Sequence, residues 1–172
     1  MQLSSILLLP ALLGAAGDAL PPNWKMFSQK AAGFTVAMPE LPKEKKQKVD
    51  TATGQLQVTL YVAEGRDDSV FVVSHSDLPE ADLKKGSVDR RLDQARDSAV
   101  SSARGKLRGE KPLMMNGHPG REITIENPRG AVIVHMRIFL VQHRLYQIMV
   151  LGDGSFSAKE VAFFMDSFRL IK

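Results

Sequence analysis

The chain of 172 residues has no cysteine. Disulfides, thiol nucleophiles, cysteine-based metal sites and cysteine-linked lipid anchors are therefore excluded. Without disulfides, the hydrophobic core alone must stabilise the fold. A chain of about 150 residues can do so, because it buries roughly 68–70% of its unfolded surface. The length predicts one domain.

Long apolar runs are also scarce. The apolar run near the N-terminus covers residues 6–16 and is interrupted by a proline, whereas a membrane-spanning helix needs about 20 residues. Small residues suited to signal peptidase occupy positions 14–19. We expect a secretory signal over residues 1–19 and an exported domain, periplasmic or secreted, over residues 20–172. Because residues 1–5 contain no lysine or arginine, an uncleaved anchor stays open as an alternative.

Motifs for catalysis and for metal binding are missing as well. The four histidines do not stand at spacings typical of metal ligands. Residues 152–155 do not form the nucleophile elbow of a serine hydrolase, and no glycine-rich phosphate loop is present. We expect neither a cofactor nor a metal site.

Basic residues exceed acidic ones, and the formal net charge is +4. They cluster at 43–48, 84–91 and 104–111 without interleaved aromatic residues. Surfaces that bind single-stranded nucleic acid usually combine the two, and an exported protein rarely meets nucleic acid. We therefore expect no nucleic-acid partner, and at most weak contact with an anionic membrane surface.

Two stretches have the period of an amphipathic helix. The longer one begins at Ser87, a favourable N-cap, and its apolar residues recur every three or four positions as far as Leu107. The second begins with the capping box Ser157–Glu160. Its apolar face consists of Val161, Phe164, Met165 and Phe168.

Strands are predicted at 33–39, 55–64 and 70–75 from apolar or alternating patterns. The second strand has one apolar face, formed by Leu56, Val58, Leu60 and Val62. The third is too apolar for one exposed face, which favours an interior position. The lysine-rich stretch 41–48 is typical of an exposed edge or loop, and 169–171 can form a last short strand.

The segment from Lys111 to Leu151 is predicted to form an antiparallel meander. Its strands lie at 111–115, 121–126, 131–141 and 145–151. Asn116-Gly117 is a strong hairpin turn. Residues 118–120 indicate a widened turn or bulge, because proline cannot donate to the ladder and glycine frees the backbone.

A four-residue turn at 127–130 sets the predicted register of the central hairpin. It places Glu122 opposite His135 and leaves the apolar residues of both strands on one face. The register of the hairpin at 131–151 stays open, because loops of two and three residues place Tyr146 on opposite faces.

The order of strands, a long helix, a meander and a final helix indicates an α+β domain, in which a twisted antiparallel sheet carries packed helices. Five stretches of core and turn residues stand out: Trp24–Phe27, Gly33–Pro42, Asn116–Glu122, Arg144–Gln147 and Phe164–Phe168. Together they resemble small exported bacterial proteins of planctomycete type. More distantly, they resemble PsbP/Mog1-like domains and DcrB-like lipoproteins.

The resemblance covers nearly all of residues 20–172 and implies an α/β/α sandwich. Relatives of this fold are mostly non-enzymatic: PsbP assists the lumenal side of photosystem II, and Mog1 binds the GTPase Ran. No motif here matches either binding surface, so neither partner is carried over. DcrB-like lipoproteins have a lipobox cysteine, which this chain lacks.

The polar face of the sheet is the best candidate for a partner surface. Tyr61, Glu122, His135 and Arg137 are expected there, and tyrosine and arginine are favoured in interfaces. We expect a non-enzymatic binding or accessory module of the cell envelope, with an envelope protein as candidate partner. Two alternatives stay open: a hydrolase or metal-dependent enzyme that uses Glu122 and His135, and a structural envelope component.

Overall fold

The computed structural model describes residues 21–171 except 52–53, 85, 128 and 130, so the signal predicted at 1–19 lies outside the described residues. The strands are β1 (Lys25–Gln29), β2 (Phe34–Met38), β3 (Lys43–Thr51), β4 (Gly54–Glu64), β5 (Val70–Asp77), β6 (Lys106–Met115), β7 (His118–Asn127), β8 (Val132–Val141), β9 (Arg144–Gly152) and β10 (Arg169–Leu170). The helices are η1 (Lys30–Ala32, a 3-10 turn), α1 (Glu80–Leu83), α2 (Val88–Ser102) and α3 (Ala158–Ser167).

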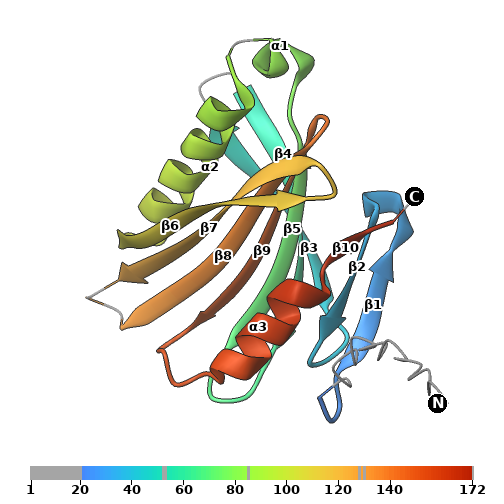
Figure 1. Cartoon of the computed structure of the whole chain (residues 1–172), viewed down its shortest axis with the longest axis vertical. Helices are drawn as coiled ribbons and strands as arrows, with labels where there is room; N and C mark the ends of the chain where they lie inside the picture. The colour runs from blue at the N-terminus through green and yellow to red at the C-terminus, as the bar shows by residue number, and fades with distance from the viewer. Residues whose placement is uncertain (1–20, 52–53, 85, 128, 130, 172) are drawn as a thin grey trace, which may run out of the picture.

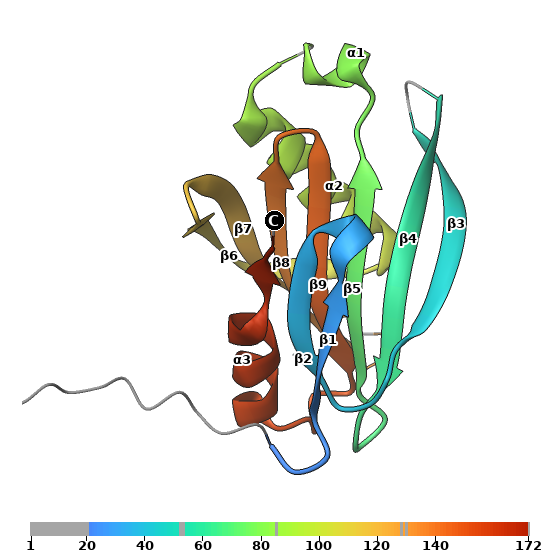
Figure 2. The same ribbon diagram turned by 90° about the vertical axis from the view of Figure 1, so that its right-hand side faces the viewer.

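Two antiparallel sheets form the fold. The larger has seven strands in the order β3-β4-β5-β9-β8-β7-β6, and the smaller has the order β1-β2-β10. Helix α2 packs on β7 and β8, while α3 and the small sheet lie on the opposite face of the large sheet (Figures 1 and 2). The predicted α+β class with helices on an antiparallel sheet is confirmed.

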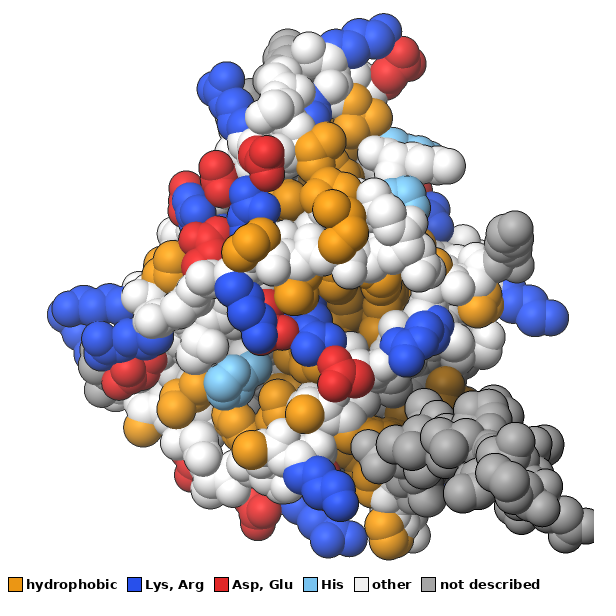
Figure 3. Space-filling view, in the orientation of Figure 1, with side chains coloured by type: hydrophobic (Ala, Val, Ile, Leu, Met, Phe, Trp, Pro, Cys, Tyr) orange, Lys and Arg blue, Asp and Glu red, His pale blue; other side chains and the backbone are white. Residues whose placement is uncertain are grey.

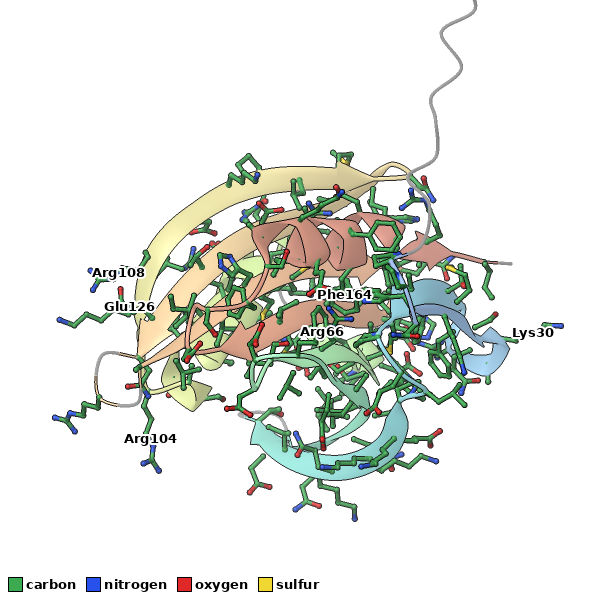
Figure 4. The ribbon with its side chains drawn as sticks, turned by 90° about the horizontal axis from the view of Figure 1, so that it is seen from below. Lys30, Arg66, Arg104, Arg108, Glu126 and Phe164 are labelled. Carbon is green, nitrogen blue, oxygen red and sulfur yellow. The ribbon has the colours of Figure 1, made fainter. Side chains whose placement is uncertain are left out.

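Each face of the large sheet has its own hydrophobic core. Beneath α2, Leu92 packs with Ile123 and other side chains of β7 and β8. On the opposite face, Phe164 of α3 packs edge-to-face on Phe71 at a ring-centroid distance of 5.1 Å. Figure 4 shows Phe164 between α3 and the sheet, whereas Lys30 and Arg104 point outward.

Both main helices start where the sequence predicts. The Ser87 hydroxyl accepts a bond from the Arg90 amide at 3.2 Å, and Ser157 accepts one from the Glu160 amide at 3.4 Å. The predicted extension of the first helix to Leu107 is wrong, because α2 ends at Ser102. Arg104 adopts a left-handed φ of 47° and turns the chain into β6.

The predicted pairing of the central hairpin is wrong by two residues. Glu122 lies opposite Arg137, and His135 lies opposite Thr124. The reason is Ala131, whose φ of 49° makes it part of the turn rather than the first residue of the strand. Because the shift is even, every side chain still lies on its predicted face.

The predicted bulge at 118–120 is also wrong. Asn116-Gly117 forms the hairpin turn as expected, and Gly120 then pairs regularly with Leu113 of β6 and Phe139 of β8. Gly120 is required for space, since a Cβ there would lie 2.4 Å from the Phe139 ring. The register shift of this strand pair lies instead in β6, between residues 107 and 109.

The open question of the last hairpin is resolved by the pairing of Val141 with Arg144. This short loop directs Tyr146 into the core beside the small sheet, where its hydroxyl donates to the Ala32 carbonyl at 2.6 Å. Strand β5 lies in the interior of the large sheet, as predicted. The lysine-rich β3 is an exposed edge strand, also as predicted.

Candidate functional site

A groove opens between α3 and the neighbouring strands β7 and β8, with a volume of about 380 Å³. We call it the α3 groove. Its polar floor is formed by Glu122, His135 and Arg137 from the sheet. Its apolar wall is formed by Phe156, Ala158, Val161, Ala162 and Met165. Figure 3 looks onto this face of the molecule and shows charged and histidine side chains among hydrophobic ones.

Local sequence explains both sides of the groove. Successive side chains of β7 and β8 point to opposite faces of the sheet. The apolar side chains therefore lie under α2, and the polar ones face α3. On α3, positions 158, 161, 162 and 165 follow helical spacing and therefore share one flank. Ala158 and Ala162 are exposed, and their small side chains leave room beside the helix.

Ion pairs fix the floor of the groove. Arg137 Nε lies 2.6 Å from Glu122 Oε2, and Lys111 Nζ lies 2.6 Å from Glu122 Oε1. Arg137 also donates from Nη1 to Asp166 Oδ1 of α3 at 2.7 Å. Both oxygens of Glu122 are thus engaged, and Arg137 bridges the sheet to the helix.

These contacts set the protonation states of the pair. Burial would raise the pKa of Glu122, but the bonds from Lys111 and Arg137 outweigh it and hold this pKa below its ordinary value. Burial would lower the pKa of Arg137, but its bonds to Glu122 and Asp166 raise it. Both groups are therefore charged at neutral pH.

His135 is the neutral member of the floor. Burial lowers its pKa, against a smaller upward effect of the Glu122 carboxylate. Its Nδ1 lies 3.4 Å from Thr124 Oγ1, and its ring meets Phe156 edge-to-face at 5.5 Å. Among the described residues, no hydrogen bond engages its Nε2, which leaves that atom for a ligand.

This arrangement does not form the proposed Glu–His pair. Glu122 is engaged by two cations and is a weak base, and its cross-strand partner is Arg137 rather than His135. In the part of the chain that the structure describes, no group of three or more possible metal ligands occurs.

The structure places the four predicted surface residues on one face, but it exposes only three to a groove. Tyr61, Arg137 and Glu122 lie in one row across the sheet, linked through β5 and β9. Glu122, His135 and Arg137 meet at the α3 groove. Tyr61 is 4% exposed and packs on Phe34 of the small sheet. It cannot contribute to a partner surface, which corrects the prediction.

Sequence reasoning did not identify the groove residues outside the central hairpin. Lys111 and Asp166 complete the ion-pair network, and Phe156 precedes α3 in a loop. One sequence pattern did point to the wall of the groove: residues 158, 161, 162 and 165 have helical spacing and lie beside the main apolar face of the C-terminal helix. No sequence signal showed which strand that flank would face.

Comparison with known proteins agrees with this architecture. No protein-family model matches the chain, and no curated protein matches it. Among solved structures, it is similar to the solution structure of cyanobacterial PsbP (CyanoP) from Synechocystis sp. PCC 6803. The TM-score is 0.55 at 12% identity, over 92% of this chain and 98% of that chain. The chain has a PsbP-like fold.

The PsbP-like fold agrees with the resemblance seen in the sequence. At this identity the likeness concerns the fold alone, so the α3 groove has to be interpreted from its own residues. In the part of the chain that the structure describes, no helix has both the length and the apolar character needed to cross a membrane.

Proposed function

We propose that this chain is an exported, non-enzymatic binding module of the cell envelope, and that the α3 groove is its ligand site. The observation that carries the proposal is a hollow of about 380 Å³ with a polar floor and an apolar wall. Small-molecule sites have volumes of about 300–1,000 Å³ and combine apolar walls with a few oriented polar groups.

The charges of the groove indicate the class of ligand. Lys111 and Arg137 are balanced by Glu122 and Asp166, so neither an anion nor a cation gains a net attraction. The wall on α3 offers contact to an apolar body, and His135 Nε2 offers one hydrogen bond. We therefore propose a small, uncharged, mostly apolar ligand with a hydroxyl or similar group.

The enzymatic alternative has less support, although Glu122 and His135 do line the same groove. That alternative needs Glu122 and His135 to act as a pair, and Glu122 is instead engaged by Lys111 and Arg137. An accessory role agrees with the PsbP-like fold, which we read as an analogy of fold only. The more specific likeness to planctomycete-type, Mog1-like and DcrB-like proteins stays a prediction.

Export is the second part of the proposal and rests on residues 1–19. Mass spectrometry of the protein from fractionated cells should find a mature N-terminus near Leu20 outside the cytoplasm. An intact N-terminus in the cytoplasmic fraction would refute export without affecting the groove.

The ligand proposal is tested with 1-naphthol, an uncharged aromatic molecule with one hydroxyl. Fluorescence titration should show saturable binding to the full chain, with a Kd insensitive to salt because the groove has no net charge. Ala162→Trp should abolish binding, since the new side chain fills the groove from an exposed position. Lys159→Trp on the same helix is the matched control and should bind normally.

A second variant tests the polar contact. His135→Phe keeps the ring against Phe156 and removes Nε2. Loss of one hydrogen bond, worth about 1–1.5 kcal/mol, should weaken binding about tenfold. Equal affinity of all these variants, or no saturable binding at all, would contradict the proposed site.

A further inference from the structure

The sheet face that carries α2 continues as an apolar surface beyond that helix. One row runs from Val62 through Val72 and Met149 to Met136 and Ile123. Met136 and Ile123 are buried beneath α2, whereas Val62 and Met149 are partly exposed. Strand β4 extends this surface with the side chains that we call the β4 strip: Leu56, Val58, Leu60 and Val62.

The β4 strip departs from the usual orientation of an alternating strand. The apolar residues face away from the small sheet and are only half-buried, while Thr59 and Tyr61 on the other face of the strand are buried, Tyr61 against Phe34 of the small sheet. An antiparallel sheet with one solvated face normally turns polar residues outward. A polar outer face would be expected here if water were the only neighbour.

The geometry of the sheet leaves room for one more helix. Strands lie about 4.8 Å apart, so β4 lies roughly 14 Å from β8, over which α2 packs. Packed helices lie about 8–10 Å apart, so a second helix centred over β5 fits beside α2 and reaches the side chains of β4. From Leu56 to Val62 the strip is about 20 Å long, the length of a helix of about 14 residues. Figure 2 shows β3 and β4 at the sheet edge farthest from α3.

The charged side chains beside the strip indicate the sign of the charge that a partner should carry. Lys43 and Lys45 of β3 pair with Val62 and Leu60 and so lie on the same face. Lys45 has no carboxylate partner among the described residues, and Lys43 meets only exposed Glu64 at 3.9 Å. The aspartates of α2 do not neutralise these lysines, because Asp89 and Asp93 pair with Arg121 of β7 and Asp97 pairs with Arg96 of α2 itself. Two copies of this chain would bring their lysine-rich β3 edges together and repel.

We propose that the β4 strip is the docking site for an amphipathic helix of a partner protein, with acidic residues on the side that faces β3. The apolar face of that helix covers the strip beside α2, and its acidic flank meets Lys43 and Lys45. This surface lies on the opposite face of the sheet from the α3 groove, so the module can hold a ligand and a partner at once.

The probe is a lactam-bridged helical peptide of about 14 residues, with leucines on one face and glutamates on one flank. A second peptide keeps the leucines and replaces each glutamate by lysine. In a methyl-labelled NMR titration of the full chain, the acidic peptide should shift Val58, Leu60 and Val62, and the basic peptide should bind at least fivefold more weakly.

Lys45→Glu should weaken the acidic peptide about fivefold and strengthen the basic one. Lys48→Glu makes the same charge change on the other face of β3 and should leave both affinities unchanged. Three results would each overturn the proposal: equal affinity of the two peptides, binding of vesicles with anionic lipids through the strip in place of the peptide, and a dimer that buries the strip in sedimentation equilibrium.

Discussion

Gly120→Ala should destabilise the fold strongly, although it adds only one methyl group. The new Cβ would lie 2.4 Å from a ring carbon of Phe139 and 2.5 Å from the carbonyl oxygen of Ile138, whereas carbon atoms in contact stay about 3.5–4.0 Å apart. Phe139 is 4% exposed and fixed in the core, and the carbonyl belongs to the backbone of β8. The steric clash is therefore relieved only if β7 and β8 move apart.

Overpacking of this kind costs about 1–3 kcal/mol, and the backbone contact puts Gly120→Ala at the upper end, about 3 kcal/mol. For a domain of this size the same loss lowers Tm by roughly 6–12 °C. Urea unfolding followed by circular dichroism measures it. Gly109→Ala is the control, because a Cβ there meets nothing within 4 Å and should change stability by less than about 0.5 kcal/mol. Equal stability of the two variants would refute the close approach of β7 and β8.

Two further predictions concern buried polar groups. Tyr146→Phe should cost about 1–3 kcal/mol in urea unfolding, because the buried carbonyl of Ala32 loses its donor. Burial lowers the pKa of both His75 and His135 below the ordinary histidine value of about 6.5, so the folded chain prefers neutral imidazoles. Stability should be constant above about pH 7 and should fall as the pH drops below 6.5, because the unfolded chain takes up protons first. A thermal-unfolding series in which His75→Gln has the same pH slope as the parent would show that His75 does not contribute.

Local patterns were enough to predict the parts of the fold that depend on neighbouring residues. The caps at Ser87 and Ser157 could be read directly, because a hydroxyl and a nearby amide suffice to form them. The faces of β7 and β8 were also correct despite the wrong pairing. Alternation has a period of two, so the shift caused by Ala131 did not exchange the faces.

Long-range packing could not be predicted in the same way. Alternation in β4 shows which residues share a face, but it does not show which face another element will cover. The small sheet covers the face that carries Tyr61. Within that sheet, Arg169 of β10 pairs with Thr35 of β2, which is far away in the sequence. No local sequence pattern predicts such a long-range pairing, so Tyr61 was wrongly predicted to lie on a surface.

The candidate site was predicted in part for the same reason. Glu122, His135 and Arg137 share a face because of local alternation, and that was sufficient to group them. The groove itself depends on where α3 crosses the sheet. That position is fixed by contacts such as the Ser167 hydroxyl with the Ala37 amide at 2.9 Å, which connect distant parts of the chain.

The most direct test of the α3 groove as a ligand site is a set of intermolecular NOEs between 1-naphthol and the methyl groups of the full chain. A probe bound in the α3 groove should give NOEs from its aromatic protons to Ala158, Val161 and Ala162, and these NOEs should be lost in Ala162→Trp. NOEs to the methyl groups of the β4 strip alone, or to no methyl group at saturating probe, would contradict the assignment of the α3 groove as the ligand site.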